Sequence, residues 1–296
     1  MTAPGFDGFH AVDHDVDGVR LHAAIGGDGP PVLLVHGYPQ THRMWHHVAP
    51  VLARTHTVVV PDLRGYGASD KPVSTPDHAT YSKRAMAGDL VGLMHILGHE
   101  TFAVAGHDRG ARVTHRLALD HPESVQRAAV LDIVPTSYAY AHVDRALAEA
   151  YDHWFFLSGP ADLPEHLIGL DPGRWLRTKL AQWSGGGIEG FDPAAVEAYV
   201  AAFSDPAGIA ATCEDYRAGA TVDLEHAEAD AATDRRVTVP LLALWGADGF
   251  VGRRYDVLDV WLGYADDVSG QALPGGHFLP EEAPAATTAA LVEFFA

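Results

Sequence analysis

Short apolar runs alternate with helix-like segments along most of this chain. The runs lie at residues 32–35, 58–60, 102–105, 128–133 and 241–245, with a weaker one at 268–273. Continuous apolar runs of this length are typical of strands that are buried on both faces of a sheet. Apolar residues recur at helical spacing in residues 81–97, 111–119 and 285–295. Strands that alternate with helices predict an α/β fold built on a mostly parallel, doubly wound sheet.

Two parts of the chain depart from this alternation. Residues 10–16 and 19–25 alternate polar and apolar positions around Asp17-Gly18, which predicts a β-hairpin at the start of the chain. Residues 136–236 are rich in Ala, Trp, Tyr and Gly and have a helical pattern, and the strand pattern returns at Val239. A helical insert between two strands predicts a cap over the strand ends, where open α/β sheets bind ligands. We therefore predict a core domain of residues 1–135 and 237–296, and a helical cap domain of residues 136–236 inserted after the sixth strand.

The composition narrows the class of protein. The 296 residues are 47% hydrophobic and 20% charged, and no run of 18 apolar residues occurs, so a large core is expected and a membrane span is not. The N-terminal segment is acidic and lacks the apolar stretch of a secretory signal. These features predict a cytoplasmic protein. The single cysteine, Cys213, excludes an internal disulfide.

The charge balance limits the ligands. Lys and Arg number 20 against 39 Asp and Glu, a formal net charge of −19, which predicts no binding to nucleic acid. An anionic substrate would need a local cluster of arginines, because the distant surface charge is screened over roughly 8 Å. Most of the 19 histidines lack the spacing of metal ligands. We predict neither a metal nor a cofactor.

The strongest chemical motif follows the run at residues 102–105. Residues 106–110 read GHDRG, a G-x-D-x-G pattern between a buried strand and a helix. This is the nucleophile-elbow pattern with Asp108 where serine usually stands. The simpler interpretation is an ordinary strand-to-helix turn in which Asp108 caps the helix.

The surrounding motifs favour the elbow. HGYP at residues 36–39 follows one strand, DLRGYGAS at residues 62–69 follows the next, and His277 lies between the last strand and the last helix. The chain order of nucleophile, acid and histidine is that of α/β-hydrolases, which is the fold predicted here. A carboxylate is ionised at neutral pH and can displace a group at a saturated carbon, which forms an ester. His277 would then act as general base for water that hydrolyses this ester.

Two aspartates are candidates for the acid that orients His277. Asp132 ends the strand after the elbow helix, and Asp248 follows the next strand. Both positions serve this purpose in different α/β-hydrolases, so the pattern alone leaves the choice open.

Two arginines stand close to the candidate nucleophile. Arg109 follows Asp108, and Arg112 is three residues further along the same predicted helix face. Guanidinium groups bind carboxylates bidentately, and local cations would offset the repulsion between an anionic nucleophile and an anionic substrate. The alternative is that one or both arginines point to solvent or pair with acids.

The predicted cap carries aromatic side chains that are also hydrogen-bond donors. His153, Trp154 and Tyr216 are among them. Such residues usually pack within a domain. A leaving fluoride, however, needs several donors to replace its water.

These motifs together resemble the fluoroacetate (haloacetate) dehalogenases over essentially the full chain. The matching segments are HGYPQ at residues 36–40, GHDRGAR at 106–112, LDIVP at 131–135, His153-Trp154, Tyr216, and GHF at 276–278. The resemblance implies hydrolysis of small 2-haloacids without a cofactor, by a homodimer.

The resemblance also assigns roles to the residues. It implies Asp108 as nucleophile, His277 as base and Asp132, rather than Asp248, as the acid. It implies Arg109 and Arg112 as ligands of the substrate carboxylate. It further implies His153, Trp154 and Tyr216 as halide donors, and the backbone amides of Tyr38 and Arg109 as oxyanion donors.

Other functions remain in competition. An epoxide hydrolase also uses an elbow aspartate and needs two cap tyrosines, here Tyr216 with one of Tyr138, Tyr140, Tyr151 and Tyr199. Its neutral substrate, like that of a haloalkane dehalogenase, leaves Arg109 and Arg112 without a role. A non-catalytic carboxylate-binding protein of this fold is a third possibility, which the complete set of Asp108, His277 and an acid argues against.

Overall fold

A computed structural model describes residue 3 and residues 5–296, and its centre is an eight-stranded sheet. The strand order is β1-β2-β4-β3-β5-β6-β7-β8. The antiparallel hairpin of β1 and β2 joins the remaining strands, which run parallel to one another. The bounds are β1 His10–Val16, β2 Val19–Gly26, β3 Pro31–Val35, β4 Thr57–Pro61, β5 Phe102–His107, β6 Val125–Leu131, β7 Leu241–Gly246 and β8 Val268–Leu273. The predicted hairpin and the mostly parallel sheet are confirmed.

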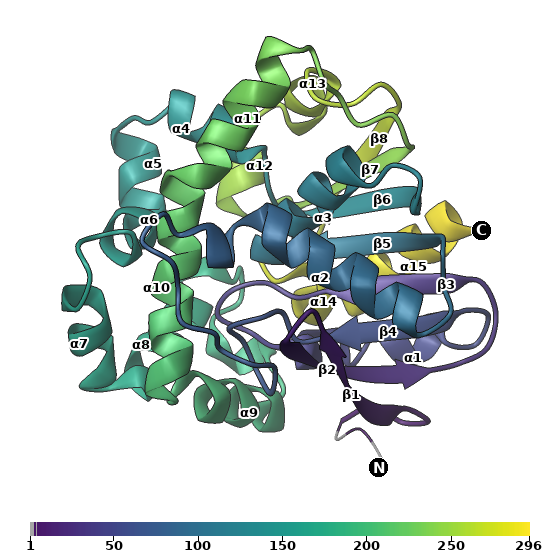
Figure 1. Cartoon of the computed structure of the whole chain (residues 1–296), viewed down its shortest axis with the longest axis horizontal. Coiled ribbons are helices and arrows are strands. Elements are labelled where there is room, and N and C mark those ends of the chain that lie inside the picture. Colours follow the sequence, from purple (N-terminus) through teal and green to yellow (C-terminus); the bar gives the residue numbers. More distant parts are fainter. Residues whose placement is uncertain (1–2, 4) are drawn as a thin grey trace.

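Helices cover both faces of the sheet. Figure 1 shows α2 (Lys83–Ile96) and α3 (Arg109–Asp120) in front of the strands, and α1 (Ala49–Leu52) and α15 (Pro284–Phe295) behind them. This cover explains why β5 is buried at all six positions, whereas the outermost strand β8 exposes much of its length. Shorter helices α12 (Phe250–Arg254), α13 (Val257–Leu262) and α14 (Leu279–Glu282) complete the layers around the last strands.

Between β6 and β7 the chain forms helices only. They are α4 Thr136–Ala141, α5 Arg145–Ala150, α6 Asp152–Leu157, α7 Leu163–Gly169, α8 Pro172–Trp183, η3 Ile188–Gly190, α9 Pro193–Phe203, α10 Pro206–Ala220 and α11 Val222–Ala232. In Figure 1 most of them gather beside one end of the sheet. Three of them, α8, α9 and α10, begin with an Asp-Pro pair in which the aspartate caps a backbone N–H. The insert follows the sixth strand as expected, while its independence as a domain stays a prediction.

The strand predicted at residues 128–133 ends earlier than expected. β6 stops at Leu131 because Asp132 has a φ of 54°, outside the strand region. This turn lifts Asp132 off the strand end and toward the neighbouring loops. None of the described helices is long and apolar enough to cross a lipid bilayer.

Candidate active site

The elbow around Asp108 is a sharp turn between β5 and α3. Asp108 has φ 49° and ψ −114°, a conformation that residues with a side chain rarely adopt. The two glycines of the motif make room for it, since a Cβ on Gly106 would lie 2.3 Å from the Gly110 carbonyl oxygen, and one on Gly110 would lie 2.3 Å from the His36 carbonyl oxygen. The sequence thus places one side chain at the apex of a close-packed turn.

The Asp108 carboxylate is held by a backbone amide from another loop. Asp108 stands at the N-cap position of α3, but its side chain makes no capping hydrogen bond to the helix, so capping does not account for this side chain. Its Oδ1 instead accepts the Tyr38 N–H at 2.9 Å. Its other oxygen, Oδ2, lies 3.7 Å from His277 Nε2. One carboxylate oxygen is therefore fixed, and the other faces the histidine.

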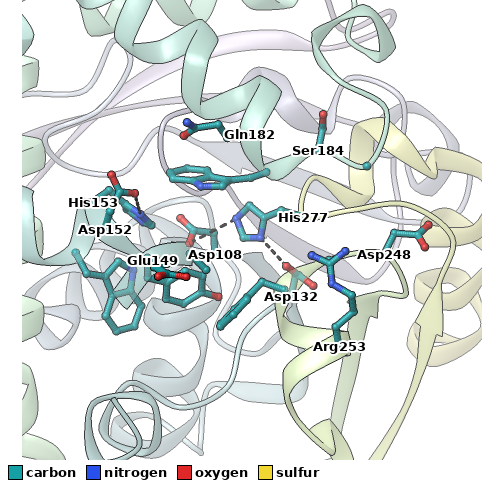
Figure 2. Close-up of a pocket in the computed structure, with 17 residues that line it drawn as sticks. Asp108, Asp132, Glu149, Asp152, His153, Gln182, Ser184, Asp248, Arg253 and His277 are labelled. Carbon is teal, nitrogen blue, oxygen red and sulfur yellow. Dashed lines mark hydrogen bonds and ion pairs between the residues drawn. The ribbon is translucent and has the colours of Figure 1, made fainter. Parts of the chain in front are cut away.

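His277 lies between two aspartates, as Figure 2 shows. Its Nδ1 lies 2.6 Å from Asp132 Oδ2, while Asp132 Oδ1 accepts the Gly246 N–H at 2.9 Å. Asp248 is exposed and lies beyond Arg253 in the same view. Of the two candidate acids, Asp132 is the one that contacts the histidine.

The charge state of His277 follows from these neighbours. Burial favours the neutral ring, but the hydrogen bond and charge of Asp132, together with the charge of Asp108, raise the pKa of His277 above its usual value. The neighbouring His107 has its pKa lowered to about 3, chiefly by burial. Neutral His107 donates from Nε2 to the His277 carbonyl at 2.7 Å. It thereby fixes the loop that carries the histidine.

A cavity of about 770 Å³ opens over these residues. Residues from the core and from the cap line it: Asp108, Asp132, Tyr151, His153, Trp154, Trp183, Phe250 and His277 are among them, with Glu149, Asp152, Gln182, Asp248 and Arg253 (Figure 2). The cavity thus lies where the insert meets the strand ends. No group of three or more His, Cys, Asp or Glu side chains in the described part of the chain is arranged to hold a metal ion.

Arg109 is buried and paired. Its Nε and Nη2 donate to the two carboxylate oxygens of Asp215 at 3.0 and 2.7 Å, and Nη2 also donates to the Asp215 carbonyl at 2.7 Å. Its guanidinium carbon lies 4.2 Å from the ring centre of Tyr216. Pairing with an acid was one of the alternatives predicted for the arginines, and Arg109 has this kind of partner in Asp215 on cap helix α10.

Arg112 is buried and forms no ion pair with a carboxylate of the described residues. Its Nη1 donates to the Val134 carbonyl and to the Thr136 hydroxyl at 3.2 and 2.9 Å. Its guanidinium carbon lies 4.6 Å from the ring centre of Trp154. Burial and the charge of Arg109 lower its pKa, and the charge of Asp108 acts in the opposite direction. Neither arginine lines the cavity over Asp108; Arg112 lines a second cavity of about 450 Å³.

The three cap aromatics predicted to bind halide form part of one aromatic cluster. The ring centres of His153 and Tyr216 are 5.5 Å apart, and each ring also contacts the ring of Tyr38. The Tyr216 hydroxyl is buried and makes no hydrogen bond to the described residues. His153 Nδ1 makes none either, although it lies 3.9 Å from Asp152. Buried polar atoms normally have partners, so these two indicate a place for a small polar ligand.

Some residues of the site were missed by reasoning from the sequence. Asp215 and Tyr38 contribute side chains to the site, and no sequence motif had assigned a role to these side chains. Trp183, at the end of α8, lines the cavity, and its backbone carbonyl accepts the His277 N–H at 3.0 Å. A buried acid opposite an arginine leaves no spacing pattern in the sequence, because the two residues lie 106 positions apart.

The fold and the site now define the class of protein. A family model described as alpha/beta hydrolase fold matches residues 30–284, and the sheet and the elbow described above agree with it. The chain belongs to the alpha/beta-hydrolase family.

Within this family the chain is similar to a dehalogenase. It is 47% identical to a fluoroacetate dehalogenase from Burkholderia sp., over 98% of this chain and 94% of that protein. It is 34% identical to a soluble epoxide hydrolase from Corynebacterium sp. strain C12, over 95% of each. A solved structure of the alpha/beta-hydrolase type from Nostoc sp. PCC 7120 is 53% identical, with a TM-score of 0.95 over 97% of both chains. The predicted resemblance to fluoroacetate dehalogenases is confirmed, and the chain is an enzyme of the hydrolase class.

Proposed function

We propose that this enzyme hydrolyses small 2-haloacids, such as fluoroacetate, to the 2-hydroxyacid and halide through an ester on Asp108. The similarity to fluoroacetate dehalogenase supports this proposal. Epoxide hydrolases are related as well, so the choice of substrate has to come from the site itself.

The observation that carries the proposal is the charge of Arg112, which forms no ion pair with the described residues. The residue is 4% exposed, and its hydrogen-bond partners are a carbonyl and a hydroxyl. A buried cation without a counter-ion costs several kcal/mol. The carboxylate of a haloacid would supply that counter-ion, whereas a neutral epoxide or haloalkane would not.

The first step is displacement at the halogen-bearing carbon. Asp108 Oδ2, the oxygen not held by Tyr38, attacks this carbon, and the carbon–halogen bond breaks with its electron pair leaving on the halide. Asp108 thereby becomes an ester. The unpartnered Tyr216 hydroxyl, the His153 ring and the Trp154 indole N–H would donate to the departing halide, which needs donors most when it is fluoride.

The second step is hydrolysis of the ester. His277 Nε2 takes a proton from water, and the resulting hydroxide attacks Asp108 Cγ. The Cγ–Oδ2 bond then breaks, Oδ2 leaves as the hydroxyl oxygen of the 2-hydroxyacid with the proton returned by His277, and the oxygen from water completes the regenerated carboxylate. The Tyr38 amide, already bonded to Oδ1, would stabilise the oxyanion, with the Arg109 amide as the second donor implied by the family. Asp108 loses its charge on ester formation, which removes one cause of the raised pKa of His277. A larger fraction of His277 is therefore neutral, and able to accept a proton, once the ester has formed.

The test is a trapped intermediate. The His277→Asn variant should release one equivalent of halide from fluoroacetate and then retain an added acyl mass on Asp108 in intact-protein mass spectrometry. Wild-type protein should release fluoride repeatedly and show no added mass. Continued turnover by the variant with only unmodified protein would mean that another base acts.

An epoxide hydrolase is the second candidate. Tyr151 lines the cavity with Asp108, and Tyr216 is packed against Arg109, so two cap tyrosines lie near the nucleophile. Tyr199, by contrast, donates to Glu281 at 3.1 Å and is occupied. Side-by-side assays of fluoroacetate and styrene oxide decide between the candidates, because conversion of the epoxide alone would overturn the proposal.

The family resemblance also leads us to propose a homodimer that acts in the cytoplasm. Light scattering after size-exclusion chromatography measures the mass in solution, and a monomer at assay concentration would contradict the first part. Cell fractionation tests the second.

A further inference from the structure

Asp215 lies at the centre of a buried polar cluster between the cap and the core. It belongs to α10 and is 0% exposed. Besides Arg109, it accepts the Tyr66 hydroxyl at 2.6 Å and forms an ion pair with Lys83. Despite its burial, the charges of Arg109 and Lys83 hold the pKa of Asp215 below its usual value. Asp215 is therefore ionised throughout the neutral pH range.

These contacts fix the direction of the Arg109 guanidinium. Nε and Nη2 both donate to Asp215, whereas Nη1 makes no hydrogen bond to the described residues. Tyr216 stacks on one face of the group. Gly219, one turn after Asp215, allows the close approach, since a Cβ there would lie 3.0 Å from Nη2. Nη1 of the Arg109 guanidinium therefore remains available to another ligand.

The cluster also cancels its own charge. Lys83 lies 3.5 Å from Asp223 on α11 as well as beside Asp215, so two cations face two carboxylates. Arg112, in contrast, forms no ion pair with the described residues and is influenced only at longer range by the charge of Asp108. The two arginines are thus unequal: Arg112 supplies net charge, and Arg109 supplies a directed N–H group.

We propose that Asp215 is a positioning residue that presents Nη1 of Arg109 to the carboxylate of the substrate and couples this arginine to cap helix α10. This inference rests on the proposed function. It adds Asp215, a residue of the cap, to those that determine the preference for haloacids over neutral substrates. Without the Asp215 carboxylate, the guanidinium would lose its two-point contact and adopt several orientations.

The kinetic test compares Asp215→Asn with Asp223→Asn. Both variants remove one carboxylate from the same cluster, but only Asp215 touches Arg109. For bromoacetate, Asp215→Asn should raise KM about tenfold or more and change kcat less. For bromoacetamide, which has the same leaving group and no charge, kcat/KM should change by less than about twofold. Asp223→Asn should leave the ratio between the two substrates unchanged.

A second readout reports on Arg109 without turnover. The Nε–H resonance of Arg109, assigned in a ¹⁵N NMR spectrum by its loss in Arg109→Lys, should be slow to exchange in the wild type and fast in Asp215→Asn. Acetate should shift this resonance in the wild type and fail to do so in the variant. If Asp215→Asn does not fold, the double variant Lys83→Met/Asp215→Asn removes one cation with the acid, and the same results are expected of it.

The outcomes separate the two proposals. Equal losses on bromoacetate and bromoacetamide, or an unchanged Arg109 resonance in the variant, would overturn the role of Asp215. A wild-type protein that releases no halide from any haloacid would overturn the proposed function, and the NMR comparison would still decide whether Asp215 orients Arg109.

Discussion

The core side and the cap side of the cavity differ in how completely their polar atoms are satisfied. On the core side, Asp108 is held by Tyr38, and His277 is held by Asp132. On the cap side, one nitrogen of His153, which lines the cavity, and the hydroxyl of Tyr216, whose ring contacts that of His153, make no hydrogen bond to the described residues. The groups proposed to make and break bonds are thus held in position by the protein itself. The groups proposed to bind the halide still have hydrogen-bonding capacity for a ligand.

The same contrast divides the two arginines. Arg109 forms an ion pair with Asp215, whereas Arg112 is buried beside Trp154 and forms none with the described carboxylates. An unsatisfied group costs stability in the free protein and is useful only when a ligand completes it. In this protein the groups proposed to bind the substrate therefore cost more stability than the groups proposed to carry out the reaction.

The largest effect should come from the core side. Asp108→Asn keeps the size of the side chain but lacks the charge for attack, so fluoride release should fall by about 10⁴-fold or more. A fluoride electrode measures this directly. Thermal denaturation serves as the control for folding. Sustained release above a few per cent of the wild-type rate would remove Asp108 from the mechanism.

The acid that supports His277 should be Asp132. Asp132→Asn should slow ester hydrolysis by about 10²- to 10⁴-fold, and Asp248→Asn should do far less. Only neutral His277 can act as base, so activity falls as the pH drops below its raised pKa. Loss of Asp132 lowers that pKa, and the acidic limb of the pH–rate profile should move to lower pH. A larger loss in Asp248→Asn would reverse the assignment.

Arg112 should increase kcat/KM for anionic substrates and should lower the stability of the protein without substrate. Arg112→Met leaves the substrate carboxylate uncompensated, which should cost about 2–5 kcal/mol in kcat/KM for bromoacetate and much less for bromoacetamide. Because the variant also removes an unpaired buried cation, its midpoint of thermal unfolding should be no lower than that of the wild type. A strongly destabilised variant with equal losses on both substrates would make Arg112 a structural residue.

The smallest effects should appear in the halide site. Tyr216→Phe and Trp154→Phe remove donors while largely preserving ring volume, and each should cost about 1–3 kcal/mol in the transition state for fluoroacetate. The cost for bromoacetate should be smaller, because bromide leaves more readily with fewer hydrogen bonds. Parallel kcat/KM values on the two acids measure this bias. Equal losses would identify both residues as packing residues of the cap.

The order of the elements and the position of the elbow that carries Asp108 could be predicted from local patterns. Apolar runs identify buried strands, and G-x-D-x-G at residues 106–110 identifies the elbow, because a tight strand-to-helix turn needs glycines at fixed offsets. The insertion after β6 was visible because the strand pattern stops at Pro135 and resumes at Val239. All of these signals lie within a few residues of one another.

Contacts between distant segments were decided by the tertiary structure alone. Asp132 and Asp248 both follow strands, and only the left-handed turn at Asp132 and the path of the loop at residues 274–278 bring one of them to His277. Likewise, helical spacing placed Arg109 and Arg112 on one face but could not show that, among the described residues, Asp215 forms an ion pair with the first and no carboxylate forms one with the second. The sequence by itself determined which reactive groups this protein carries, since local geometry depends on neighbouring residues; the packing of cap against core decided which of their charges remain free.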